Sequence, residues 1–159
     1  MDFHERCPEL AERETRSIFA GPRGILPPDE YGFVEYYCAN PACDCRQVLI
    51  VVLARNSPDT PAAFIRYGWE SEEFYRRWFE ERPEEEAAEL FRELTTATLD
   101  SIASQSSFAG YLLNQFQGMI ANESEFAARF ERHYRAFRAT LKSKNPQGAD
   151  RRPPKRRRK

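Results

Sequence analysis

The middle of the chain carries patterns typical of β-strands. Residues 31–37 are rich in aromatic side chains, and residues 47–54 form a continuous aliphatic run of the kind that is buried on both faces of a sheet. Residues 62–67 form a third candidate strand, which follows the turn-rich segment 56–61. Because the connections are short, these strands are expected to pair as a three-stranded antiparallel meander, with the 47–54 run in the middle.

Helical patterns lie on both sides of these strands. Residues 9–19 have helical character, and a loop rich in glycine and proline separates them from the first strand. Ser71 is placed to cap a helix that reaches Arg82. Pro83 ends that helix and begins a second one, which is expected to run to about Ile102 with the Ile102 side chain facing inward.

Two more helices complete the prediction. Residues 108–120 repeat apolar side chains at intervals of three and four, which indicates a third helix. Asn122 and Glu125 have the capping-box spacing and predict the start of a fourth helix. Its apolar stripe consists of Phe126, Phe130, Phe137 and Leu141. The fold class is therefore α+β, a three-stranded antiparallel meander followed by a layer of about four helices.

Composition favours a single domain. A chain of 159 residues with 41% hydrophobic and 13% aromatic residues has enough apolar area for one core. The longest apolar run, residues 48–54, is seven residues long, whereas a membrane-spanning helix needs roughly twenty. The N-terminal residues lack the apolar segment of a secretory signal. We therefore expect a cytoplasmic protein without a membrane association, whose residues 1–145 form one α+β domain.

Charge divides the chain into two parts. The net charge of −1 is the sum of −7 for residues 1–149 and +6 for residues 150–159. We expect residues 146–159 to form a disordered basic tail, because they offer little apolar area to bury. Such a tail can stay solvated, contact the protein's own acidic face, bind the phosphates of a nucleic acid, or act as an import-type signal. The nucleic-acid-binding candidates are Arg151, Arg152, Lys155, Arg156, Arg157, Arg158 and Lys159.

The strongest chemical signal is a cluster of cysteines. Three of the four lie within eight residues, at the predicted turn between the first two strands, as Cys38, Cys43 and Cys45. A reversing loop can bring three thiolates to about 2.3 Å from one zinc ion, and we predict such a site with one zinc. A disulfide is a less favoured alternative, because thiols are expected to be reduced in a chain without a secretory signal. The other alternative is a thiol redox protein or sensor that uses the Cys43–Cys45 pair, with Arg46 favouring the thiolate.

Three cysteines leave a closed zinc site one ligand short. The candidates for the fourth ligand are His133, Cys7, His4 and Asp44. His133 lies in the apolar stripe of the fourth helix, not on the arginine-rich side that includes Arg129, so its ring points inward; a buried histidine with a hydrogen-bond partner is the competing interpretation. Cys7 and His4 lie near the N-terminus, which is a poor place for a preformed ligand. Water in the fourth position would allow catalysis, but no convincing base accompanies the cluster.

Motifs of common enzymes are missing. The sequence has no P-loop, no G-x-G-x-x-G turn, no G-x-S-x-G elbow and no H-E-x-x-H helix, which removes the easily read nucleotide-binding, hydrolase and metalloprotease mechanisms. Clustered glutamates at 84–86 are explained by the positive end of a helix dipole. We expect a small zinc-binding interaction or structural module and not an enzyme, with an unidentified protein partner and an open oligomeric state.

Three groups of residues carry a resemblance to other proteins. They are Tyr31–Cys38 with Pro41 and Cys43–Arg46, then Tyr67–Ser71 with Phe74, Tyr75 and Trp78, and finally His133–Phe137, within roughly residues 10–141. In these segments the chain resembles an uncharacterised family of small, mostly bacterial proteins. That family has no known activity, so the resemblance implies no substrate or reaction. It implies a shared site formed by Cys38, Cys43, Cys45 and His133, and it favours His133 over Cys7 as the fourth ligand.

Overall fold

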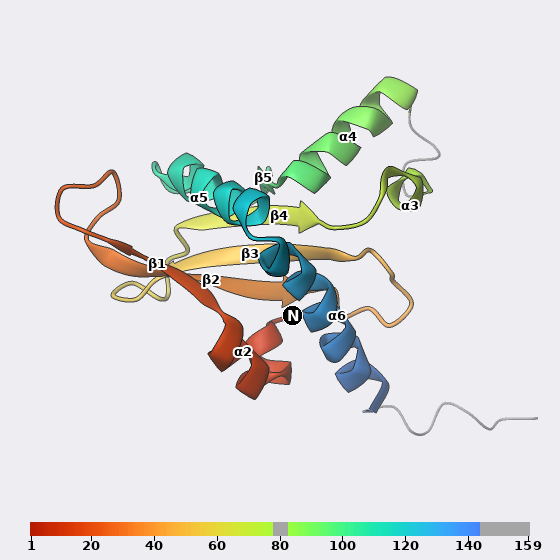
Figure 1. The fold of residues 1–159 in the computed structure, drawn as a ribbon, viewed down its shortest axis with the longest axis horizontal. Coiled ribbons are helices and arrows are strands. Elements are labelled where there is room, and N and C mark those ends of the chain that lie inside the picture. The colour runs from red at the N-terminus through yellow and green to blue at the C-terminus, as the bar shows by residue number, and fades with distance from the viewer. Residues whose placement is uncertain (78–82, 144–159) are drawn as a thin grey trace, which may run out of the picture.

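An antiparallel sheet with α5 and α6 lying across one face forms the centre of the computed structural model, which describes residues 1–77 and 83–143 (Figure 1). Within these residues the sheet has five strands in the order β1-β2-β3-β4-β5. The strands are β1 Arg16–Ala20, β2 Asp29–Tyr37, β3 Gln47–Ala54, β4 Ala63–Gly68 and β5 Thr98–Leu99. The helices are α1 Phe3–Arg6, α2 Pro8–Glu14, α3 Glu72–Arg76, α4 Glu84–Thr96, α5 Ala109–Asn122 and α6 Ser124–Ser143. The α+β prediction is confirmed, with the predicted meander at the middle of the sheet.

The aliphatic strand β3 lies in the middle of the sheet, as its composition predicts. It pairs with β2 on one side and with β4 on the other, where Ile50 lies opposite Ile65. Ile50 and its neighbour Val51 point to opposite faces of the sheet, and both are buried. On the face of Ile50, the ring of Phe33 from β2 stacks on Phe116 of α5 at 6.0 Å. The main hydrophobic core therefore lies between this face and the C-terminal helices.

The predicted first helix is wrong in its second half. Helix α2 ends at Glu14, and the following residues form β1, in which Ile18 pairs with Tyr31 of β2. A three-stranded meander would leave the outer edge of β2 without backbone hydrogen-bond partners, and β1 supplies them. This long-range pairing outweighs the weak local preference for a helix.

The predicted second helix is too long. Helix α4 ends at Thr96, Ala97 adopts a left-handed φ of 67°, and Leu99 of β5 then pairs with Ile65 of β4. Ile102, expected to face inward, is 87% exposed. The helix ends early because of a long-range contact. Thr98 and Leu99 pair with the edge of β4 and so cannot continue the helix.

The remaining helix ends were predicted with mixed success. The Ser71 hydroxyl accepts a hydrogen bond from the backbone N–H of Phe74, which confirms the cap of α3. Asn122 does not act as the predicted capping-box residue: it ends α5, and its amide donates to the carbonyl of Gly118. The predicted helix end at Arg82, the domain boundary at residue 145 and the basic tail lie outside the described residues. Within the described part of the chain, the helices are each too short or too polar to span a bilayer.

Gly68, the last residue of β4, allows α3 and α4 to approach the sheet closely. A Cβ atom here would lie 2.5 Å from the hydroxyl oxygen of Tyr75 and 2.7 Å from Cγ of Leu94. We expect Gly68→Ala to lower the free energy of unfolding by about 1–3 kcal/mol through overpacking, as measured by denaturant unfolding. Gly32→Ala in β2 is the matched control, because nothing lies within 4 Å of a Cβ atom there. Equal destabilisation by both substitutions would contradict the packing argument.

Candidate metal centre

The connection between β2 and β3, residues 38–46, carries the three clustered cysteines. The loop is fixed from outside at several points. The hydroxyl of Tyr75 in α3 donates to the carbonyl of Arg46 at 2.7 Å. From α6, the Tyr134 hydroxyl donates to Asp44 at 3.1 Å, and Arg138 donates to the carbonyls of residues 40 and 41. The loop that presents the cysteines is therefore held by two helices, α3 and α6, that come later in the chain than the loop.

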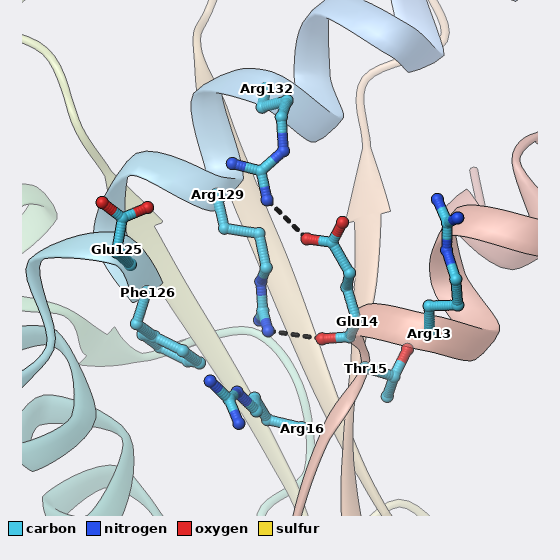
Figure 2. Close-up of a pocket in the computed structure, with 8 residues that line it drawn as sticks. All are labelled: Arg13, Glu14, Thr15, Arg16, Glu125, Phe126, Arg129 and Arg132. Atoms are coloured by element: carbon cyan, nitrogen blue, oxygen red, sulfur yellow. Dashed lines mark hydrogen bonds and ion pairs between the residues drawn. The ribbon is translucent and has the colours of Figure 1, made fainter.

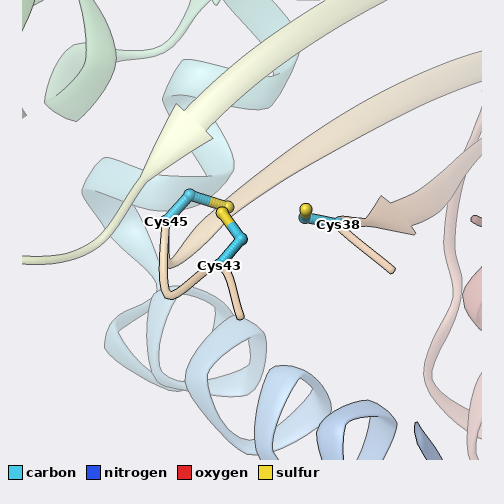
Figure 3. Close-up of side chains that lie close together, drawn as sticks. All are labelled: Cys38, Cys43 and Cys45. Carbon is cyan, nitrogen blue, oxygen red and sulfur yellow. The ribbon is translucent and has the colours of Figure 1, made fainter. Parts of the chain in front are cut away.

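The three cysteine sulfurs converge. The Sγ atoms of Cys38, Cys43 and Cys45 all lie within 4.8 Å of one another, and all three residues are half-buried. Figure 3 shows the sulfurs of Cys43 and Cys45 side by side, with Cys38 facing them from the end of β2. Two thiolates on a tetrahedral zinc at about 2.3 Å are roughly 3.8 Å apart, so small side-chain adjustments bring these atoms to ligand positions. The predicted convergence is confirmed, and the cluster could hold a metal ion such as zinc.

The electrostatic surroundings do not activate a free thiolate. Burial and, to a smaller extent, the neighbouring Cys43 raise the pKa of the Cys45 thiol to about 12. Arg46, expected from the sequence to favour the thiolate, is paired instead with both oxygens of Asp44 at 3.1 Å and with Glu70 at 2.7 Å. A redox thiol needs a lowered pKa and an uncompensated positive neighbour. Neither the raised pKa of Cys45 nor the paired Arg46 provides these conditions.

His133, the predicted fourth ligand, is not brought to the cysteines. Its Nδ1 lies 2.8 Å from a carboxylate oxygen of Glu35, its Nε2 lies 3.1 Å from one of Glu14, and its ring stacks on Phe3 at 4.6 Å. Both nitrogens that could ligate a metal are therefore occupied. The inward orientation was predicted correctly, but the competing interpretation, a buried histidine with hydrogen-bond partners, describes its contacts in this structure.

The other three candidates also lie outside the group of sulfurs. Within residues 1–77 and 83–143, the cluster that includes these cysteines has no fourth histidine, cysteine or carboxylate. Cys7 stands at the junction of α1 and α2, and His4 is exposed on α1. Asp44 is directed to Arg46 and Tyr134, and the hydrogen bonds from Arg46 hold the pKa of its carboxyl below the usual range. The sequence analysis thus placed three candidate ligands together correctly, and the structure brings none of its four candidates for the fourth position into their group.

Sequence reasoning missed a buried charged network beside the core. Glu35 is 4% exposed, pairs with Arg129 at 3.1 Å, and accepts a hydrogen bond from the Tyr37 hydroxyl at 2.7 Å. Arg129 had been assigned to the solvent side of its helix, yet it is also 4% exposed, with its guanidinium 4.4 Å from the ring centre of Phe126. The sequence did contain a signal for this. Glu35 lies two residues from Phe33 and two from Tyr37 in β2, so it shares the inward face of these aromatic residues.

Comparison of the chain with models of protein families, with curated proteins and with solved structures finds no match. The resemblance to a family of small bacterial proteins therefore stays a prediction from the sequence, and the function is argued from the site alone.

Proposed function

We propose that the protein binds one zinc ion through Cys38, Cys43 and Cys45, and that the metal locks the β2–β3 loop of a structural or interaction module. The observation that carries this proposal is the convergence of three sulfurs within 4.8 Å. Thiolate ligands in a loop between two strands are typical of structural zinc sites. Metal binding in such sites is coupled to folding, because the unfolded chain does not keep the ligands together.

The fourth coordination position is open to a donor from outside the cluster. Zinc in structural sites takes four ligands, and the nitrogens of His133 and the carboxylate of Asp44 are already engaged. With zinc bound, water would fill this position in the isolated protein, and a side chain of a partner protein would be able to replace it. This arrangement supports an interaction module, since a partner that completes the zinc site would bind to the loop directly.

Metal and thiol analysis of the same sample tests this function. Protein purified without added metal is expected to contain about one equivalent of zinc. Its three cluster thiols are expected to resist alkylation until a chelator removes the metal. Cys7 lies outside the cluster, so in mild denaturant without a chelator it should be alkylated first. Absence of metal together with rapid reaction of the cluster thiols in the native protein would contradict the proposal and support the redox alternative.

A further inference from the structure

A second feature of the molecule lies away from the cysteines, between the α2–β1 junction and the first turns of α6. It is a pocket of about 260 Å³ that is open to solvent (Figure 2). Four arginines line it, accompanied by two glutamates. The charged residues are Arg13, Glu14, Arg16, Glu125, Arg129 and Arg132. The lining therefore carries a net positive charge, in a body whose residues 1–149 sum to −7.

Two of the pocket arginines, Arg16 and Arg132, have side chains that are about half exposed, and each forms an ion pair with a glutamate. The Glu14 carboxylate already accepts from Arg132 and lies 3.1 Å from His133. Figure 2 shows the Glu125 carboxylate directed away from the guanidinium groups of Arg16 and Arg129. Outside the pocket, Arg16 has only an exposed contact with a carboxylate of residue 123 at 3.4 Å, which contributes little in water. Arg16 and Arg132 are therefore held by exposed ion pairs, for which a dianion can compete.

Arg129 differs from Arg16 and Arg132 because its charged side chain is buried. Its side chain is 5% exposed, and its Nε atom is buried without a hydrogen-bond partner. One terminal nitrogen donates to the backbone carbonyl of Glu14, and the other forms the ion pair with Glu35. Burial lowers the pKa of the Arg129 guanidinium, while the charge of Glu35 opposes this change and the more weakly acting charge of Arg16 adds to it. An anion placed between these two guanidinium groups would relieve their mutual repulsion.

We infer that this pocket binds the phosphate group of a small phosphate monoester through Arg16 and Arg132, next to the buried charge of Arg129. A phosphate offers three acceptor oxygens and close to two negative charges near neutral pH, which suits several guanidinium donors better than a carboxylate does. This inference is independent of the zinc site, because no cysteine lines the pocket.

Calorimetric titration of the full-length protein with phenyl phosphate tests the inference. At about pH 7.5 and low salt, where the phosphate is mostly dianionic and screening is weak, saturable binding is expected. Benzoate, which carries the same ring on a carboxylate, should bind more weakly. Arg16→Gln should weaken phenyl phosphate binding about tenfold, because one charge-assisted contact is lost. Arg16 is exposed, so this variant is expected to fold normally, as its circular dichroism and melting temperature will show.

Arg92→Gln on α4 is the matched control, since it changes the net charge equally and Arg92 does not line the pocket. Unchanged binding by this control supports the inference. Equal weakening by both variants would overturn it and would attribute the attraction to the overall charge. No weakening by Arg16→Gln would also overturn it and would attribute the attraction to another site, such as the basic tail. Absence of saturable binding to the unaltered protein, or equally tight binding of benzoate, would also overturn it.

Discussion

Glu35→Gln is expected to lower the free energy of unfolding by about 3 kcal/mol, even though the two side chains have nearly the same shape. Glu35 is the common partner of Arg129, Tyr37 and His133 in the interior. The amide keeps the volume but removes the charge, which leaves the buried guanidinium without a counterion. For a chain of this length the melting temperature should fall by roughly 6–12 °C, as measured by calorimetry or circular dichroism.

Glu30→Gln provides the matched control on the same strand. Glu30 pairs with Arg55, but its side chain is 29% exposed and that of Arg55 is 76% exposed, so a change below about 1 kcal/mol is expected. A double variant, Glu35→Leu with Arg129→Met, removes both charges and should recover much of the stability lost by Glu35→Gln. If Glu35→Gln destabilises the protein no more than Glu30→Gln does, the network is not the strong charge pairing that its burial indicates.

Cys43→Ser is expected to remove the bound zinc and the stability that comes with it. When free zinc exceeds its dissociation constant a thousandfold, binding to the folded state alone contributes about 4 kcal/mol, and the variant should lose most of this. The measurement is a thermal unfolding curve with and without a chelator, together with the zinc content of each sample. In the chelator, the original protein and Cys43→Ser should melt at similar temperatures, because the metal accounts for the difference between them.

Cys7→Ser is the control that shows whether the loss of zinc is specific to the cysteines of the cluster. Cys7 is half-buried at the α1–α2 junction and is not a member of the sulfur group, so this variant should keep its zinc. Loss of zinc from Cys7→Ser would restore Cys7 as the fourth ligand and would require the N-terminal helices to move. Full zinc retention by Cys43→Ser would instead argue that the three sulfurs do not form the metal site.

Helix α6 connects the charged network with the cysteine loop through adjacent residues. His133 contacts Glu35 of β2, and the next residue, Tyr134, donates to Asp44 in the loop. The sequence had suggested that a metal joins the last helix to the sheet through His133. The structure makes this connection with hydrogen bonds and the Arg129–Glu35 ion pair, and none of these side chains belongs to the group of three sulfurs.

Local patterns predicted much of this molecule. The aliphatic run at 47–54 had to be a buried strand, because so many β-branched and leucine side chains need cover on both faces. Ser71 was recognised as a helix cap since its partner N–H lies only three residues away. The convergence of Cys38, Cys43 and Cys45 was likewise predictable, because a short turn brings residues within eight positions together whatever the rest of the fold does.

Contacts between distant segments decided the rest. Strands β1 and β5 form where the edges of β2 and β4 offer unpaired backbone groups, and neither segment signals this in its own residues. The partners of His133 are 98 and 119 positions away, at Glu35 and Glu14, so no spacing in the sequence distinguishes a metal ligand from a member of a buried charge network. An ionisable side chain inside a protein must find a compensating partner, and only the packed chain determines which partner lies within reach.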